Sequence, residues 1–190
     1  ISEKFFTVKE RVIPENDSEL YVSRISRKKN QEYLLEHLDY ESLNLRLVGG
    51  VHEEAYKESL LEQYPGAGER FVGFVPDEQL LEEYRTARVF VLPSQHENFG
   101  FTALEAMASG TPVIIRDTIG LADFLDPNGD DGVIRFSTPK EMEMAVDQLL
   151  TDDDKWQQLS ENALATAREM RWPNIVDQYV EFYDEVLESQ

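Results

Sequence analysis

The chain has 190 residues, a length that suits one domain with a sizeable hydrophobic core. Its 38 Asp and Glu residues outweigh 18 Lys and Arg residues, and the net charge of −20 disfavours binding to nucleic acid, whose phosphates the protein's field would repel. Cysteine is absent, which excludes disulfides and thiolate metal sites, and no apolar run has the length of a membrane span.

Apolar runs and helical periodicities alternate along the chain. After a lead-in over residues 1–17, the pattern predicts strands at 20–23, 45–48, 70–74, 89–93, 111–116 and 132–136. Helices are predicted between the strands, at 31–41, 53–64 and 77–87 and in a segment that begins near Phe99. The chain closes with helices at 139–150, 154–170 and 173–188. This order predicts an α/β domain, with a parallel sheet and helices on both faces over 18–150 and C-terminal helices over 151–190.

In such a sheet, ligands bind in the loops at the carboxyl ends of the strands. The loop after the first strand carries Arg24, Arg27, Lys28 and Lys29, although basic residues are scarce in this chain. A cationic cluster at a helix N-terminus favours phosphate, because side-chain charge and helix dipole act together. The cluster could instead only balance the acidic surface, and that alternative stays open here.

The loop after the fourth strand, SQHENFGFTALEAMASG, becomes a helix near Phe99. We expect the amides from Gly100 to Ala103 to form a free first turn that can hold a diphosphate. Glu97 and Glu105 flank this turn, and both could accept hydrogen bonds from vicinal hydroxyls if they face one crevice. The pair alone is a weak signal, since Glu105 could equally be an exposed or capping residue.

The longer stretch FVLPSQHENFGFTALEAMASGTPVI resembles the signature of retaining glycosyltransferases of family 4, which have the GT-B fold. The shared features are a Pro-Ser pair after a strand, an E-x7-E pair with Phe-Gly after the first Glu, and EAMA-x-G-x-PVI. Arg24 and Lys29 match the spacing of the family's G-R-L-x-x-x-K-G phosphate motif, with Ser23 and Asn30 in place of its glycines. The similarity covers about residues 18–150. It implies a Rossmann-like donor-binding domain, one half of an enzyme whose N-terminal acceptor domain lies outside this chain.

The resemblance also implies a role for each matched residue. Glu97, with the backbone of Phe99 and Gly100, would contact the transferred sugar, while Arg24 and Lys29 would neutralise the diphosphate leaving group. Glu97, Arg24 and Lys29 are therefore the expected catalytic residues. The remaining residues would bind the donor: Glu105 the ribose, Thr102, Ala103 and Leu104 the ribose-phosphate side through backbone or hydroxyl donors, and Gly73, Phe74 and Val75 the base.

The implied activity is hexosyl transfer from a UDP-, GDP- or ADP-linked sugar to an acceptor hydroxyl, with retention of the anomeric configuration. No metal or other cofactor is implied, because Arg24 and Lys29 supply the positive charge, and the domain alone is expected to be inactive. The sugar, base, acceptor and oligomeric state stay unspecified. The alternatives are a GT-B epimerase or phosphorylase, or a non-catalytic nucleotide-binding module.

Other positions carry weaker expectations. Ile119 and Asp123 stand where the family often has Gly and Glu. His96 is expected to bond to solvent or its own loop, and His52 to lie at the surface. The aromatic residues of the last helix are expected to be core residues more readily than ligand contacts, with the alternative that a missing partner domain leaves some of them exposed. The first residues lack the features of a signal peptide, so we expect a cytoplasmic protein. A peripheral position at the inner membrane face of the full-length protein stays open, as does adaptation to high salt.

Overall fold

The computed structural model describes residues 1–6, 12–14, 18–125 and 131–188. Much of the predicted lead-in, at 7–11 and 15–17, therefore lies outside the described residues. The short 3-10 helix η1 (Glu3–Phe5) near the N-terminus packs into the domain, because Phe5 is buried and meets the ring of Tyr84 edge-on.

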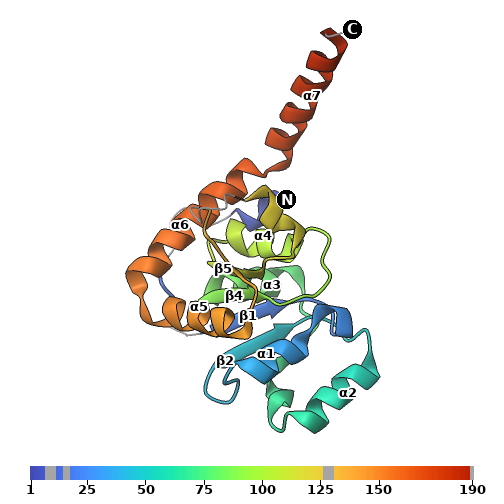
Figure 1. Ribbon diagram of the computed structural model, residues 1–190, viewed down its shortest axis with the longest axis vertical. Coiled ribbons are helices and arrows are strands. Elements are labelled where there is room, and N and C mark those ends of the chain that lie inside the picture. Colours follow the sequence, from blue (N-terminus) through green and yellow to red (C-terminus); the bar gives the residue numbers. More distant parts are fainter. Residues whose placement is uncertain (7–11, 15–17, 126–130, 189–190) are drawn as a thin grey trace.

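The described strands form one six-stranded parallel sheet in the order β3-β2-β1-β4-β5-β6 (Figure 1). The strands are β1 (Ser18–Val22), β2 (Asn44–Val48), β3 (Phe71–Gly73), β4 (Val89–Leu92), β5 (Val113–Arg116) and β6 (Val133–Phe136). Each lies within two residues of a predicted strand. The central strands β1 and β4 are buried along their whole length, which is why they appear in the sequence as short runs with little polar alternation.

Helices flank this sheet, as predicted (Figure 1). They are α1 (Gln31–His37), α2 (Glu54–Gln63), α3 (Asp77–Thr86), α4 (Phe101–Ala108), α5 (Pro139–Thr151) and α6 (Asp153–Glu169), with the 3-10 helices η2 (Arg27–Lys29), η3 (Ala67–Arg70) and η4 (Gly120–Phe124) between them. The first helix ends at His37 and not at residue 41, because Leu38 takes an extended conformation and is buried.

Along the chain, β1, β2 and β3 are added toward one edge of the sheet, and the chain then crosses back to place β4 on the other side of β1. Right-handed connections therefore place α1 and α2 on one face of the sheet, and α3 and α4, which contact each other, on the opposite face. The connections that follow the neighbouring strands β1 and β4 therefore leave toward opposite faces of the sheet, which opens a crevice at the carboxyl ends of these strands. The loops after β1 and β4 border this crevice.

The last helix, α7 (Trp172–Glu188), extends away from the rest of the domain (Figure 1). Its aromatic side chains Trp172, Tyr179, Phe182 and Tyr183 are 58% to 62% exposed. These four residues therefore do not belong to the core of the described domain, and the alternative of exposed aromatic residues on this helix is the one that holds. Helical periodicity identifies an apolar face, but it contains no information on whether another element covers that face.

Candidate functional site

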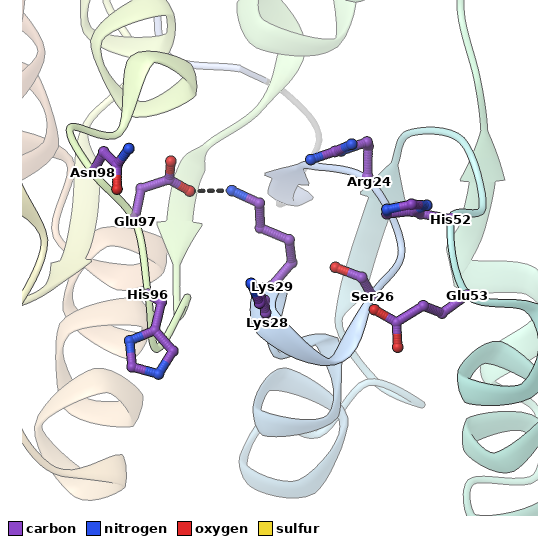
Figure 2. A pocket seen from close by; sticks show the side chains of 9 residues that line it. All are labelled: Arg24, Ser26, Lys28, Lys29, His52, Glu53, His96, Glu97 and Asn98. Carbon is purple, nitrogen blue, oxygen red and sulfur yellow. Dashed lines mark hydrogen bonds and ion pairs between the residues drawn. The ribbon is translucent and has the colours of Figure 1, made fainter.

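A polar cavity of about 390 Å³ lies where the loops after β1, β2 and β4 meet (Figure 2). Its lining consists of Arg24, Ser26, Lys28, Lys29, His52, Glu53, His96, Glu97 and Asn98. Three predicted site residues, Arg24, Lys29 and Glu97, are thus brought together. His52, predicted to lie only at the surface, and Glu53 also line the cavity, because β2 lies beside β1 and its loop reaches the same edge of the sheet.

An ion pair spans the cavity. The ammonium of Lys29 donates to Oε2 of Glu97, and Figure 2 shows the two side chains pointing toward each other. Both side chains are only about 20% exposed, so solvent screens this pair less than a surface pair. An anionic ligand in the cavity must therefore compete with Glu97 for the charge of Lys29.

Arg24 enters the cavity from the end of β1 and is exposed. Its backbone is held by the fully buried Gln31, whose Nε2 donates to the carbonyl of Arg24 at 3.0 Å and to Oγ of Ser23 at 2.8 Å. Ser23, which replaces a glycine of the resembled motif, thus takes part in fixing the loop. The guanidinium is left accessible on a fixed backbone, an arrangement suited to an anion.

The helix after β4 begins at Phe101 and not near Phe99, because Gly100 has a left-handed backbone with φ of 96°. A Cβ at Gly100 would lie 3.0 Å from Ile119 and 3.2 Å from Leu92, so the position is restricted by space as well as by conformation.

The first turn of α4 is less open than predicted. The amides of Ala103 and Leu104 both donate to the carbonyl of Gly100, at 2.9 and 3.2 Å. Ala103 and Leu104 are also buried, so their amides are less accessible than a free first turn implies, and their role toward a donor stays a prediction. Within the part of the chain that the structure describes, no backbone hydrogen bond from the amides of Gly100, Phe101 and Thr102 to a carbonyl is found, although Gly100 is buried.

Glu105 does not lie in the polar cavity with Glu97. Its Oε2 accepts a hydrogen bond of 2.8 Å from the hydroxyl of Tyr84, and Lys4 and Asp77 lie nearby. Burial raises the pKa of Glu105, and the hydrogen bond from Tyr84 partly opposes that shift. The two carboxylates therefore face different surroundings, Glu97 the polar cavity and Glu105 the hydroxyl of Tyr84 on α3.

The segment predicted to line a base, Gly73 to Val75, leads directly into α3. Gly73 has φ of 86° and ends β3, Phe74 is 82% exposed, and Val75 is buried. Asp77, the first residue of α3, is one of the charged residues that act on Glu105. Residues 73–75 therefore immediately precede the helix that contacts Glu105. Their side chains are not among those that line the polar cavity.

A second cavity, apolar and about 540 Å³ in volume, lies between the start of α4 and α7. The predicted site residues Phe99 and Leu104 line it together with side chains of α7. Any contact of Phe99 with a ligand in the polar cavity would consequently involve its backbone.

The loop after β5 packs tightly onto the loop after β4. The amide of Leu121 donates to the carbonyl of Phe99 at 2.8 Å, and a Cβ at Gly120 would lie only 2.0 Å from the carbonyl oxygen of Asn98. Ile119 is buried and Asp123 is exposed, and neither side chain lines the polar cavity. The two residues that depart from the resembled motif therefore contribute no side chain to the polar lining.

Among the described residues, no three His, Cys, Asp or Glu side chains are arranged to hold a metal ion. Of the helices in the described ranges, none combines the length and the apolar character needed to cross a membrane.

Comparison with known proteins shows extended similarity. Residues 5–166 match the family model of Glycosyl transferases group 1. An uncharacterized glycosyltransferase of Methanocaldococcus jannaschii is 31% identical over 89% of this chain and 45% of the relative. The O-antigen chain mannosyltransferase B of Escherichia coli is 29% identical over 86% of this chain and 45% of the relative.

Solved structures share the fold. A sucrose-phosphate synthase from Thermosynechococcus elongatus superimposes with a TM-score of 0.79 at 27% identity, over 100% of this chain and 52% of that protein. Anabaena HepE in complex with UDP superimposes with a TM-score of 0.74 at 24% identity, over 92% of this chain and 49% of that protein. The chain spans about half the length of these proteins.

Proposed function

The chain belongs to the Glycosyl transferases group 1 family, and from that premise we propose that it is the donor-binding domain of a retaining glycosyltransferase. The proposed reaction moves a hexose from a nucleoside-diphosphate sugar to an acceptor hydroxyl. The observation that carries the proposal is the polar cavity at the switch point of the sheet, where Arg24, Lys29 and Glu97 meet. Membership of this family favours transfer over the epimerase and phosphorylase alternatives.

The diphosphate is proposed to bind between Arg24, Lys29 and the first turn of α4. Its negative charge would draw Lys29 away from Glu97, since both anions compete for one ammonium. Glu97 would then be free to accept hydrogen bonds from the sugar. The same two cations would stabilise the charge that grows on the diphosphate as it leaves, so the proposal assigns this task to the protein's own side chains.

The nucleoside is proposed to lie along Gly73 to Val75, with its ribose hydroxyls on Glu105. The hydrogen bond of Glu105 to Tyr84 on α3, the helix that follows this segment, supports this arrangement. UDP and UDP-glucose complexes of the structural neighbour HepE support a nucleotide-sugar donor for this fold. For this chain we propose a UDP-, GDP- or ADP-linked sugar.

Retention of configuration is proposed to follow from attack on the same face that the diphosphate leaves. The bond from the anomeric carbon to the diphosphate oxygen breaks, the acceptor oxygen bonds to that carbon, and the acceptor's proton passes to the departing phosphate. Such a route needs no protein nucleophile, which is compatible with a cavity in which Glu97 is held beside a cation.

A Lys29→Ala substitution is expected to weaken UDP, GDP or ADP binding by about 10- to 100-fold, because a charge-assisted hydrogen bond contributes roughly 1.5–3 kcal/mol. Binding of the corresponding nucleoside should change little. Isothermal titration calorimetry on the 190-residue chain measures both affinities. The matched control is Lys140→Ala, which removes the same charge from an exposed lysine of α5 that does not line the cavity. Equal losses for nucleoside and diphosphate would remove Lys29 from the phosphate site.

The 190-residue chain is expected to bind a nucleoside diphosphate without transferring sugar to any acceptor, because transfer requires both reactants to be held in register. Calorimetry would report the binding, and a panel of acceptors with a labelled nucleotide sugar would report transfer. Efficient transfer by this chain alone would contradict a second, acceptor-binding domain. Binding without turnover in the full-length protein would instead favour the non-catalytic alternative.

A further inference from the structure

Hydrogen bonds join two of the loops that form the polar cavity, those after β1 and β4. The hydroxyl of the buried Tyr21, in β1, lies 2.7 Å from the carbonyl oxygen of Lys29 and 2.9 Å from Oγ of Ser94. A phenol has one proton and a carbonyl only accepts, so Tyr21 donates to Lys29 and Ser94 donates to Tyr21. This chain of bonds connects the loop after β4 to the backbone of the residue that carries the ammonium.

Asn30, the next residue, makes a second link. It is the one non-glycine residue in the described ranges with a positive φ, 61°, a conformation that asparagine tolerates better than most side chains. Its buried Nδ2 donates to the carbonyl oxygen of Pro93 at 3.2 Å. The phosphate motif that this segment resembles has glycine here. Glycine would allow the same backbone, but it would leave out the bond to Pro93.

We propose that Tyr21 and Asn30 are positioning residues that clamp the backbone of Lys29 to the loop after β4 and so hold its ammonium between Glu97 and the diphosphate. This inference rests on the proposed function. A lysine side chain loses conformational entropy when it binds a ligand. A backbone that is already fixed lowers the total entropy cost of binding, because only the side chain has to be ordered. Burial also raises the pKa of Tyr21, so its hydroxyl stays protonated and able to donate over the pH range of ordinary assays.

Two conservative variants remove the clamp while keeping its surroundings. Tyr21→Phe keeps the ring that packs edge-on against Phe90, and Asn30→Gly keeps a residue that adopts positive φ readily. The control is Tyr40→Phe, which removes a hydroxyl that bonds to the carbonyl of Pro65, in a part of the domain that does not line the cavity.

The affinities of UDP, GDP and ADP, and of uridine, guanosine and adenosine, would be measured by calorimetry on the 190-residue chain. Each clamp variant is expected to bind the preferred diphosphate about three- to tenfold more weakly, the range that one net hydrogen bond supplies. Nucleoside affinity should stay within about twofold, as should every affinity of Tyr40→Phe. Equal losses for nucleoside and diphosphate would show a general structural effect and overturn the proposal.

A double-mutant cycle tests whether the clamp acts through Lys29. In a Lys29→Ala background, adding Asn30→Gly or Tyr21→Phe is expected to weaken diphosphate binding no further. Independent losses that multiply would overturn the positioning role, because the clamp would then act on the ligand by another path.

Amide hydrogen exchange on the ligand-free chain separates this proposal from the proposed function. The amides of Lys29 and Asn30 donate to the carbonyls of Ser26 and Arg27, and both should exchange at least several-fold faster in the two clamp variants than in the wild type. Wild-type exchange rates in both variants would overturn the clamp, whatever the nucleotide affinities. A wild-type chain that binds none of the three diphosphates would contradict the proposed function and the clamp's role in it, even if exchange shows that the clamp orders the loop.

Discussion

A Glu97→Gln substitution in the full-length protein is expected to lower turnover of a nucleotide sugar by about 100- to 1000-fold, the usual scale for removing one electrostatic contact to a transition state. Positive charge builds on the sugar ring as the glycosidic bond breaks, and a carboxylate stabilises that charge better than an amide does. The affinity for the nucleoside diphosphate should stay the same or rise, because the substitution removes the carboxylate that competes for Lys29.

Steady-state kinetics and calorimetry with the nucleoside diphosphate measure the two effects separately. Glu54→Gln provides a matched control, since it makes the same chemical change at an exposed position two residues beyond His52. Normal turnover in the Glu97→Gln protein would refute the sugar role. A large loss of diphosphate affinity would place Glu97 on the nucleotide and not on the sugar.

A Glu105→Gln substitution is expected to weaken the nucleoside, the nucleoside diphosphate and the intact sugar nucleotide alike, by about 10- to 100-fold, because charge-assisted hydrogen bonds to the ribose are lost. A 2′-deoxy analogue should bind the wild type more weakly and should lose less in the variant. Glu82→Gln, an exposed glutamate on α3, serves as the control. Unchanged affinity for all three ligands in the Glu105→Gln chain would show that this carboxylate does not bind the ribose.

The pH dependence gives a second test of Glu105. Because burial raises the pKa of Glu105, its carboxylate takes up a proton at a higher pH than an ordinary glutamate does. Nucleotide affinity should therefore fall as the pH is lowered through that raised pKa, and the Glu105→Gln chain should lack this step. The stability that Glu105 contributes has the opposite sign. It is fully present below the unfolded pKa and is lost as the pH rises through the raised folded pKa, so titration of Glu105 cannot unfold the protein in acid.

Much of the fold and part of the site could be predicted from the sequence, because the signals are local. Short apolar runs mark the buried strands, and the alternation with helices leaves a parallel sheet as the simplest arrangement. Arg24, Lys29 and Glu97 each follow a strand, and the carboxyl ends of parallel strands share one edge of the sheet. Their meeting in one cavity therefore follows from segments that can be identified one at a time.

Contacts between distant segments were decided only by the tertiary structure. Lys29 and Glu97 are 68 residues apart, and Tyr84 and Glu105 are 21 apart, so neither pairing appears in any local pattern. His52 reaches the cavity because β2 lies beside β1.

The start of α4 and the exposure of α7 show the same division. Gly100 has a left-handed backbone, and the side chains of Ile119 and Leu92, from other segments of the chain, leave little space for a Cβ there. The apolar face of α7 is evident in the sequence, yet whether it is covered depends on what surrounds the helix. Hydrophobic periodicity arises from neighbouring residues on one helix or strand, so it can be identified in the sequence. The partner of a side chain, its burial and the pKa of an ionisable group depend instead on which remote segments the packing of the domain brings together.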